Sequence, residues 1–385
     1  MSSPRPTAGP ASPETITPGT SRSSRSRNIG PVAFLFIGML ALELTCRVQD
    51  LVVFGTPLLS VYTAQDQLII RDADGMHGRP HARFRKWIMN GLGMRGPEVP
   101  NAKGSMLRVV TAGASETFGL YETPAHEYPR QLEDSLVAHG LPAPQVLNAA
   151  LPGMSLPTVE EDVRNRLRRL GVDVLVYYPS PVQYLEDEQP VATAPDSVAN
   201  DQDPPRSRAL FPRVLGRIRE RIRQALPASL TTWIREREIE RAVAAHAADW
   251  RFAVLPEDRL AAFDTDLRLL VGSAHHIGAR LVLVTHANAF VAAEPADSEW
   301  RIAWERFYPR ATASTLIAFD SAGAEVTRRV ASDSAVALVD LRRITASTTG
   351  SLFADYAHFT DRGAAVAAGA VAEAIAHPQP LVTAQ

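Results

Sequence analysis

Short apolar runs alternate with amphipathic stretches through most of the chain after residue 105. The apolar runs predict five buried strands, at residues 107–112, 144–149, 172–178, 279–286 and 335–341. Helical spacing with capping and stop residues predicts helices at 128–139, 158–171, 256–274, 300–329 and 361–376. Strands that alternate with helices form parallel β-α-β units. The predicted fold class is therefore α/β, a three-layer α/β/α sandwich around a five-stranded, mainly parallel sheet.

One run near the N-terminus is apolar on every side. Residues 30–46 read GPVAFLFIGMLALELTC, in which Glu43 is the only charged side chain. A helix of this length spans about 26 Å, and a snorkelling Arg47 or slight thinning adapts it to a bilayer core of about 30 Å. A buried core helix should be amphipathic, and this run is not. A signal-peptide cleavage site, or a lipid-attachment site at Cys46, should be preceded by small residues, and LALELTC does not have that pattern. The sequence favours a single-pass transmembrane helix at 30–46.

The residues before this run predict its orientation. Residues 1–29 are rich in Ser, Pro and Thr, which predicts a disordered tail, and they carry four arginines against one acid, Glu14. The positive-inside rule keeps such a tail in the cytoplasm. The chain after residue 47 is therefore expected in the periplasm or outside the cell.

Two further segments and a C-terminal tail, 378–385, lie outside the strand–helix alternation. Residues 47–104 are turn-rich and are expected to form a linker that packs on the main domain, 105–377. Residues 185–255 interrupt that domain as an insertion that begins acidic and Pro-rich and then becomes rich in arginine.

The insertion contains a predicted amphipathic helix. Leu215, Ile218, Ile222 and Leu226 recur at helical spacing, and the arginines would form a basic outer face. One interpretation is a solvated helical cap on the core. The other is a lid that touches anionic headgroups or an acidic polymer.

Composition narrows the functional classes. Hydrophobic residues make up 45% of the chain and charged residues 21%, which suits a globular core. A net charge of −2 argues against binding nucleic acid through a basic surface. A single cysteine excludes an internal disulfide framework and a multi-cysteine zinc site. Pro80 breaks any helix that would align His77 with His81 on a metal, and the pair His275 and His276 suits a helix C-terminus.

Residues suited to acyl transfer follow three of the predicted elements. Ser115 comes directly after the first strand, at the carboxyl edge where such folds place their sites. Gly153 follows the second strand, where its backbone N–H can approach a substrate oxygen closely. Asp355 and His358 precede the last helix, and one loop can therefore supply both the base that a serine needs and the carboxylate that orients it.

These segments, in this order, resemble the sequence blocks of the SGNH/GDSL hydrolase family over residues 105–376. GAS at 113–115 is similar to the Gly-Asp-Ser block, NAALPG to the second block, and DYAH to the final Asp-x-x-His block. The upstream NGLGMRGPE, after a membrane anchor, resembles envelope-anchored members, although a structured turn that packs on the main domain explains it as well.

The resemblance implies a flavodoxin-like sheet and a serine esterase. It makes Ser115 the nucleophile, His358 the base and Asp355 its partner, with the Ser115 and Gly153 N–H groups in the oxyanion hole. No metal or organic cofactor is implied. The expected substrate is an O-acyl ester, acetyl above all, on an extracytoplasmic carbohydrate or lipid-like molecule, and the acyl group passes to water or to another hydroxyl.

The sequence departs from the family pattern at two points. Ala114 replaces the aspartate of the first block. The third block should place an asparagine after the third strand, but alignment by strand end places Val182 there, with Gln183 next to it. Losing one oxyanion donor raises the barrier by about 2.7–4 kcal/mol. Either Gln183 supplies the missing N–H, or two amides suffice, or the protein is a poor catalyst.

Two alternatives to an esterase remain open. The first is a weak or inactive protein of the same fold that serves as a binding or assembly factor in the cell envelope. The second is a membrane-surface module in which residues 206–241 bind anionic lipid.

Overall fold

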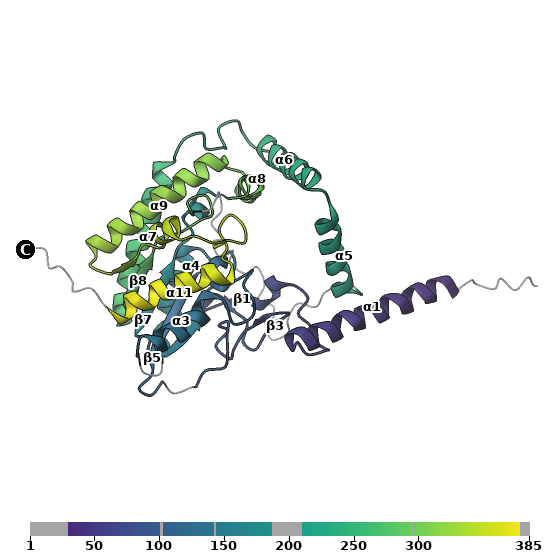
Figure 1. Cartoon of the computed structure of the whole chain (residues 1–385), viewed down its shortest axis with the longest axis horizontal. Helices are drawn as coiled ribbons and strands as arrows, with labels where there is room; N and C mark the ends of the chain where they lie inside the picture. Colours follow the sequence, from purple (N-terminus) through teal and green to yellow (C-terminus); the bar gives the residue numbers. More distant parts are fainter. Residues whose placement is uncertain (1–29, 101–102, 142–143, 187–209, 294–295, 378–385) are drawn as a thin grey trace, which may run out of the picture.

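The computed structural model describes residues 30–100, 103–141, 144–186, 210–293 and 296–377 (Figure 1). The predicted tails, 1–29 and 378–385, lie outside these residues, as do residues 187–209 of the insertion. A five-stranded sheet lies at the centre, with all strands parallel and in the order β6-β5-β7-β8-β9. The strands are β5 (Leu107–Gly113), β6 (Pro144–Asn148), β7 (Val174–Tyr178), β8 (Arg280–Val284) and β9 (Ala337–Val339). The predicted α/β fold class is confirmed.

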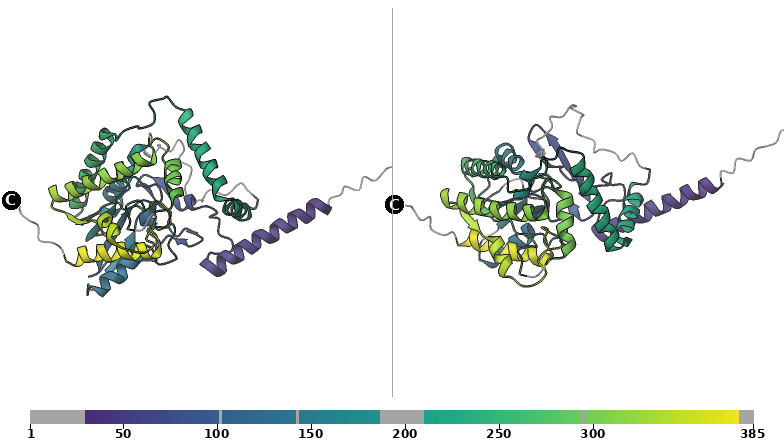
Figure 2. Two further views of the ribbon diagram at one scale, coloured as in Figure 1. Left: turned by 45° about the horizontal axis from the view of Figure 1, so that its top comes forward. Right: turned by 90° about the horizontal axis from the view of Figure 1, so that it is seen from above.

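Helices cover both faces of the sheet (Figure 2). The covering helices are α3 (Tyr128–Ala138) and α11 (Asp361–Ala376) on one face, and α4 (Leu156–Asn165), α7 (Glu257–His276) and α9 (Ala313–Asp333) on the other. Neighbouring residues of a strand point to opposite faces. Accordingly Leu175 belongs to the core under α7 and Val176 to the core under α11. Burial on both faces explains why the strands are apolar throughout.

The predicted elements between 105 and 377 are present, and the ends of most of them are shifted. The helix expected at 300–329 is two helices, α8 (Ser298–Phe307) and α9, because Pro309 disfavours helical backbone at the residue before it. The strand expected at 335–341 ends at Val339, since Asp340 caps α10 (Leu341–Ser347). The helix expected at 158–171 is α4 followed by the 3-10 turn η2 (Leu167–Arg169).

After α1 (Gly30–Phe54), residues 55–100 form small elements that pack against the sheet and α4. They contain η1 (Gln65–Leu68), β1 (Ile69–Asp72), β2 (Gly75–Gly78), β3 (Arg83–Phe84) and β4 (Trp87–Ile88), paired as two antiparallel hairpins. Met76, Met89 and Met94 are buried in the same core as α4 and α7. This segment therefore packs on the sheet and also adds to the core.

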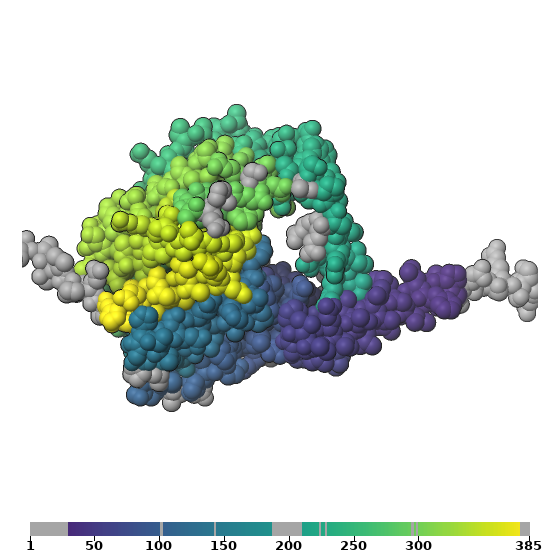
Figure 3. Space-filling model, in the orientation of Figure 1, coloured from purple at the N-terminus to yellow at the C-terminus, as the bar shows by residue number. Residues whose placement is uncertain are grey.

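The N-terminal helix α1 (Gly30–Phe54) projects from the main body (Figure 3). It continues eight residues beyond the predicted end at Cys46. Among the described residues, it is the helix that is long and apolar enough to cross a membrane. Only 6% of its most apolar stretch is buried, which disagrees with a core helix.

The insertion contains α5 (Pro212–Ala225) and α6 (Ala228–Ala244). The expectation that its apolar positions face the core is wrong for α5. Leu215, Ile218 and Ile222 are exposed, whereas Arg213 is buried. The reason is electrostatic, because Arg213 forms an ion pair with Asp50 on α1.

Candidate active site

Ser115 lies just after the end of β5, the second strand in the order of the sheet. Gly113 closes the strand beside β7, and a Cβ there would lie 2.6 Å from the Tyr178 carbonyl oxygen, so only glycine fits without a shift. Ala114 caps the short helix α2 (Ser115–Phe118), in which Ser115 is the first residue. The turn presents the Ser115 side chain at the carboxyl edge, as the sequence predicts.

Asp355 and His358 form a hydrogen-bonded pair in the loop before α11. His358 Nδ1 lies 2.9 Å from both Asp355 carboxylate oxygens, and Oδ1 also accepts the backbone N–H groups of Ala357 and His358. The Nδ1 proton therefore faces Asp355, which leaves Nε2 as the nitrogen that can accept a proton. Nε2 is buried and has no hydrogen-bond partner among the described residues.

The charges around this pair favour a protonated imidazole and an ionised carboxylate. Burial by itself lowers the pKa of His358, but the hydrogen bond and charge of Asp355, with smaller effects of Glu116 and Glu122, leave that pKa raised. Burial raises the pKa of Asp355, yet the bonds to His358 and to backbone N–H groups hold it below its usual value.

Ser115 does not hydrogen-bond to His358 in this structure. Its hydroxyl donates instead to Glu116 Oε2, at 3.2 Å. The ring of Tyr121, which is half exposed, lies 5.3 Å from the His358 ring. Glu116 is common to both groups, since it accepts the Ser115 hydroxyl and its charge acts on His358. The hydroxyl and the imidazole thus share one carboxylate neighbour.

Sequence reasoning missed a second buried pair connected to Ser115 through Glu116. Glu116 Oε1 lies 3.5 Å from His286 Nε2, and His286 Nδ1 lies 2.5 Å from Asp320. Asp320 also accepts from Asn288 at 2.6 Å and from Arg342 at 2.5 Å. The signal was available, because THAN follows the apolar β8 directly, at the same carboxyl edge.

Glu116, His286 and Asp320 carry charges of alternating sign. Burial lowers the pKa of His286, but Asp320 and Glu116 outweigh it and raise that pKa to about 9. Burial raises the pKa of Glu116, while His286 and then His358 lower it below the usual value. At neutral pH the arrangement is therefore carboxylate, imidazolium, carboxylate, and it holds an anion beside Ser115.

The expected oxyanion donors differ in their surroundings. Gly153 lies in an exposed loop at φ +76°, and a Cβ built there would meet nothing within 4 Å. Val182 is buried in the 3-10 helix η3 (Pro181–Leu185), and the Gln183 backbone N–H donates to the Ser180 carbonyl at 3.2 Å. The Gln183 backbone N–H is thus already used, so a contribution of this residue to an oxyanion hole would have to come from its side-chain amide.

The segment NGLGMRGPE contacts the C-terminal end of α2. Arg95, 4% exposed, donates to the Phe118 and Gly119 carbonyls and pairs with Glu127 at 3.2 Å. These bonds hold the end of α2 and so fix the start of the helix at Ser115. Glu122 lies close by, and burial raises its pKa to about 7. A structured turn that packs on the main domain is confirmed.

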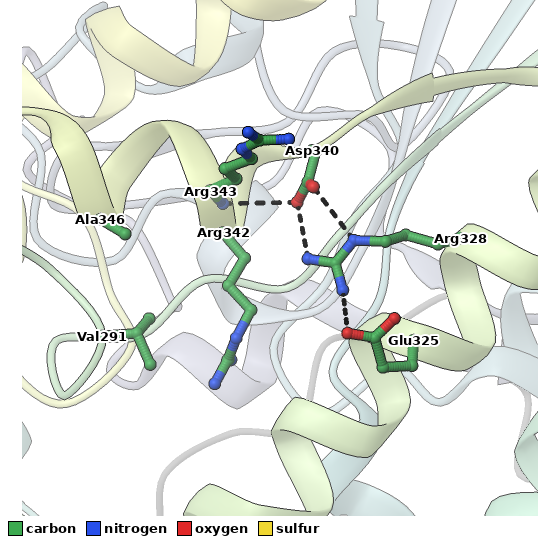
Figure 4. Close-up of a pocket in the computed structure, with 7 residues that line it drawn as sticks. All are labelled: Val291, Glu325, Arg328, Asp340, Arg342, Arg343 and Ala346. Atoms are coloured by element: carbon green, nitrogen blue, oxygen red, sulfur yellow. Dashed lines mark hydrogen bonds and ion pairs between the residues drawn. The ribbon is translucent and has the colours of Figure 1, made fainter.

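Other candidate features lie away from Ser115. An open depression of about 470 Å³ is lined by Arg328, Asp340 and Arg342 among others (Figure 4). One of its lining residues, Arg342, also reaches Asp320. His77 and His81 bind separate carboxylates, Asp72 at 3.0 Å and Glu98 at 3.1 Å. Across the described ranges, no cluster of three or more His, Cys, Asp or Glu side chains is arranged to hold a metal ion.

Fold and site together define a doubly wound α/β protein with a serine and an acid–histidine pair at the carboxyl edge of its sheet. No family model and no curated protein matches the sequence. Similar solved structures include a lipase/acylhydrolase from Enterococcus faecalis, at 16% identity, with 72% of this chain and 99% of that chain covered and a TM-score of 0.41.

Two other solved structures are similar to a comparable extent. A catalytic mutant of an acetylxylan esterase from Geobacillus stearothermophilus is 12% identical, with 72% of this chain and 97% of that chain covered and a TM-score of 0.39. A GDSL-like lipase from Bacteroides thetaiotaomicron is 11% identical, with 70% and 87% covered and a TM-score of 0.37. Similarities this distant carry no argument about activity, which depends on the site.

Proposed function

We propose that the protein is a membrane-anchored serine esterase that acts on O-acyl esters outside the cytoplasm. The observation that carries the proposal is the Asp355–His358 pair, whose Nδ1 faces the carboxylate while Nε2 is left without a partner. This is the tautomer that a serine nucleophile requires. The Glu116 carboxylate links the Ser115 hydroxyl to the same site.

In the proposed reaction, Ser115 turns from Glu116 toward His358 and attacks the ester carbonyl. His358 takes the hydroxyl proton on Nε2, and Asp355 offsets the imidazolium charge. The backbone N–H groups of Ser115 and Gly153 face the oxyanion, with the Gln183 side chain as a third donor. His358 then returns the proton to the leaving alcohol. Water releases the acyl group in a hydrolase, and a sugar hydroxyl takes it in a transferase.

The proposed anchor is α1. Its apolar side chains are exposed, and its charged residues are not. Glu43 and Asp50 are buried against Arg213, so removal of α1 as a signal peptide would leave the insertion without partners for its charge. The proposed substrate, an acetylated carbohydrate or a lipid-like ester, would be met at the outer membrane surface.

Labelling with a serine-reactive fluorophosphonate tests the catalytic proposal. Purified wild-type protein should react and turn over an acetyl ester, and Ser115→Ala should do neither. Ser351→Ala is a matched control, because this exposed serine lies near the same loop and should not affect the reaction. Labelling that persists in Ser115→Ala, or its absence in the folded wild type, would contradict the proposal.

A second function is favoured by two observations. Ser115 is bonded to an ionised carboxylate, and the expected asparagine of the oxyanion hole is absent from the third block. Both features suit a protein that keeps the fold as a binding or assembly factor in the cell envelope. In that case Ser115→Ala would leave the cellular function of the protein intact, whereas a loss of function in cells would refute it.

A further inference from the structure

Helix α5 contacts α1 through its charged side. Asp50 on α1, 2% exposed, lies 2.5 Å from Arg213 Nη1 and 2.6 Å from Arg217 Nη2. Glu43, seven residues earlier, accepts the backbone N–H groups of Arg213 and Val214 through Oε2, at 3.1 Å each. Glu43 thus caps the N-terminus of α5, where a negative charge is favourable.

The other side of α5 is apolar and uncovered. Leu215, Ile218 and Ile222 share one helix face and are 50%, 46% and 58% exposed. Phe211, just before the helix, contacts α1 instead, and its ring centre is 5.5 Å from that of Phe36. A helix on a water-soluble domain turns its apolar side to the core. Here the charged side faces the protein and the apolar side faces away.

The contacts also fix the direction in which the apolar side points. Phe36 and Asp50 are 14 residues apart on α1, about 21 Å along the helix axis. Phe211 contacts α1 toward its apolar N-terminal half, while Arg213 and Arg217 contact it toward the main domain. α5 crosses α1 rather than running beside it (Figures 1 and 2). A bilayer around the N-terminal half of α1 would therefore lie against the apolar side of α5.

We propose that α5 is an interfacial helix that rests on the outer leaflet and buries Leu215, Ile218 and Ile222 among the acyl chains. Lipid is favoured as the occupant because α5 is fastened to α1, whose own apolar side chains, such as Leu40, are exposed as well. Arg219 and Arg221 are exposed on the same helix and can reach lipid phosphates. The inference rests on the proposed anchor.

This arrangement also accounts for the acid within the apolar run. A carboxylate near the bilayer core is costly unless it is paired. Glu43 is 5% exposed, bonds to Arg47 at 3.0 Å and receives two backbone N–H groups of α5. The residue that counts against a membrane helix in the sequence is the one that fastens the interfacial helix to it.

The single cysteine makes a direct test possible. In full-length Cys46→Ser protein in lipid vesicles, a new cysteine at Ile218 or Ile222 would carry an environment-sensitive fluorophore. Leu269 on α7 is the matched control, because it is 57% exposed on the main domain. Leu40 reports on the anchor itself. Nitroxide groups on the lipid chains quench labels inside the bilayer, and aqueous iodide quenches labels in water.

The labels at Ile218 and Ile222 should be quenched several-fold more by the lipid nitroxides than the label at Leu269, and less by iodide. If the Leu40 label is in lipid but both α5 labels behave like that at Leu269, the interfacial helix is refuted and the anchor stands. If the Leu40 label is in water, the anchor is refuted. Protection of α5 from both quenchers that increases with protein density would indicate a second copy, and would also overturn the proposal.

Discussion

Replacing Glu116 by glutamine should make Ser115 more reactive. In the wild-type structure the Ser115 hydroxyl donates to the Glu116 carboxylate at 3.2 Å, and this bond holds it away from His358. A hydrogen bond to a charged acceptor contributes about 1.5–3 kcal/mol and one to a neutral acceptor about 0.5–1.5 kcal/mol. Loss of roughly 1–1.5 kcal/mol corresponds to a five- to tenfold larger population of Ser115 free to reach His358. Fluorophosphonate labelling should accelerate by about that factor.

The same substitution should also displace the pH dependence of labelling. His358 must be neutral to accept the Ser115 proton, so activity is present above its pKa and is lost as the pH falls through it. After burial and Asp355, the charge of Glu116 is the next influence on His358, and it raises that pKa. A neutral glutamine removes this influence. The acid limb of the pH–rate profile should therefore move to lower pH.

The assay is the labelling rate measured from pH 5 to pH 9, with Glu122→Gln as the matched control. The Glu122 charge also raises the pKa of His358, though less than that of Glu116, and Glu122 accepts the Tyr121 N–H instead of the serine hydroxyl. Glu122→Gln should displace the acid limb less and should not accelerate labelling. A Glu116→Gln protein with a native melting temperature, an unmoved acid limb and an unchanged or slower rate would refute the reasoning.

Two further substitutions test the Asp355–His358 pair and the packing of α3 on the sheet. Asp355→Asn should slow labelling by about 10⁴-fold in a protein that melts normally, since the His358 tautomer is then wrong, and a reduction of less than tenfold would contradict a triad. Leu132→Ala, at a side chain with no exposure between α3 and the sheet, should lower the free energy of unfolding by about 2–5 kcal/mol in urea, whereas Val137→Ala on the exposed side of α3 should change it little.

The order of elements could be predicted because periodicity and stop residues are local. Helix 361–376 was predicted with its observed ends, since Thr360 caps it and its alanine-rich face packs on α3. The break at Pro309 and the cap at Asp340 are also local, but both lie inside apolar patterns that continue across them. Periodicity measures the average over several turns, and for this reason it misses a single residue that ends an element.

The candidate site was predictable only where its residues are close in sequence. Asp355 and His358 are three positions apart, and one loop holds them in contact. The position of THAN after β8 points to His286, but no spacing in the sequence shows that His286 meets Glu116 and Asp320, which come from two other elements. The orientation of the Ser115 hydroxyl could not be predicted either. Its acceptor, Glu116, is adjacent in sequence, but the position of the Glu116 carboxylate depends on burial and on His286.

The segment that connects α1 to the sheet determines where the site lies relative to the proposed membrane. Residues 55–98 cross the carboxyl edge, where the Arg95 N–H donates to Asn148 at the end of β6 and the Trp87 indole reaches Gly119, just after α2. The same segment buries Met89 and Met94 in the core, so it is packed on the domain and is not a flexible linker. With α1 in a bilayer, as proposed, the edge that carries Ser115 would lie on the side of the domain from which α1 leaves. An ester held at the bilayer surface would therefore meet the serine without first crossing the body of the domain.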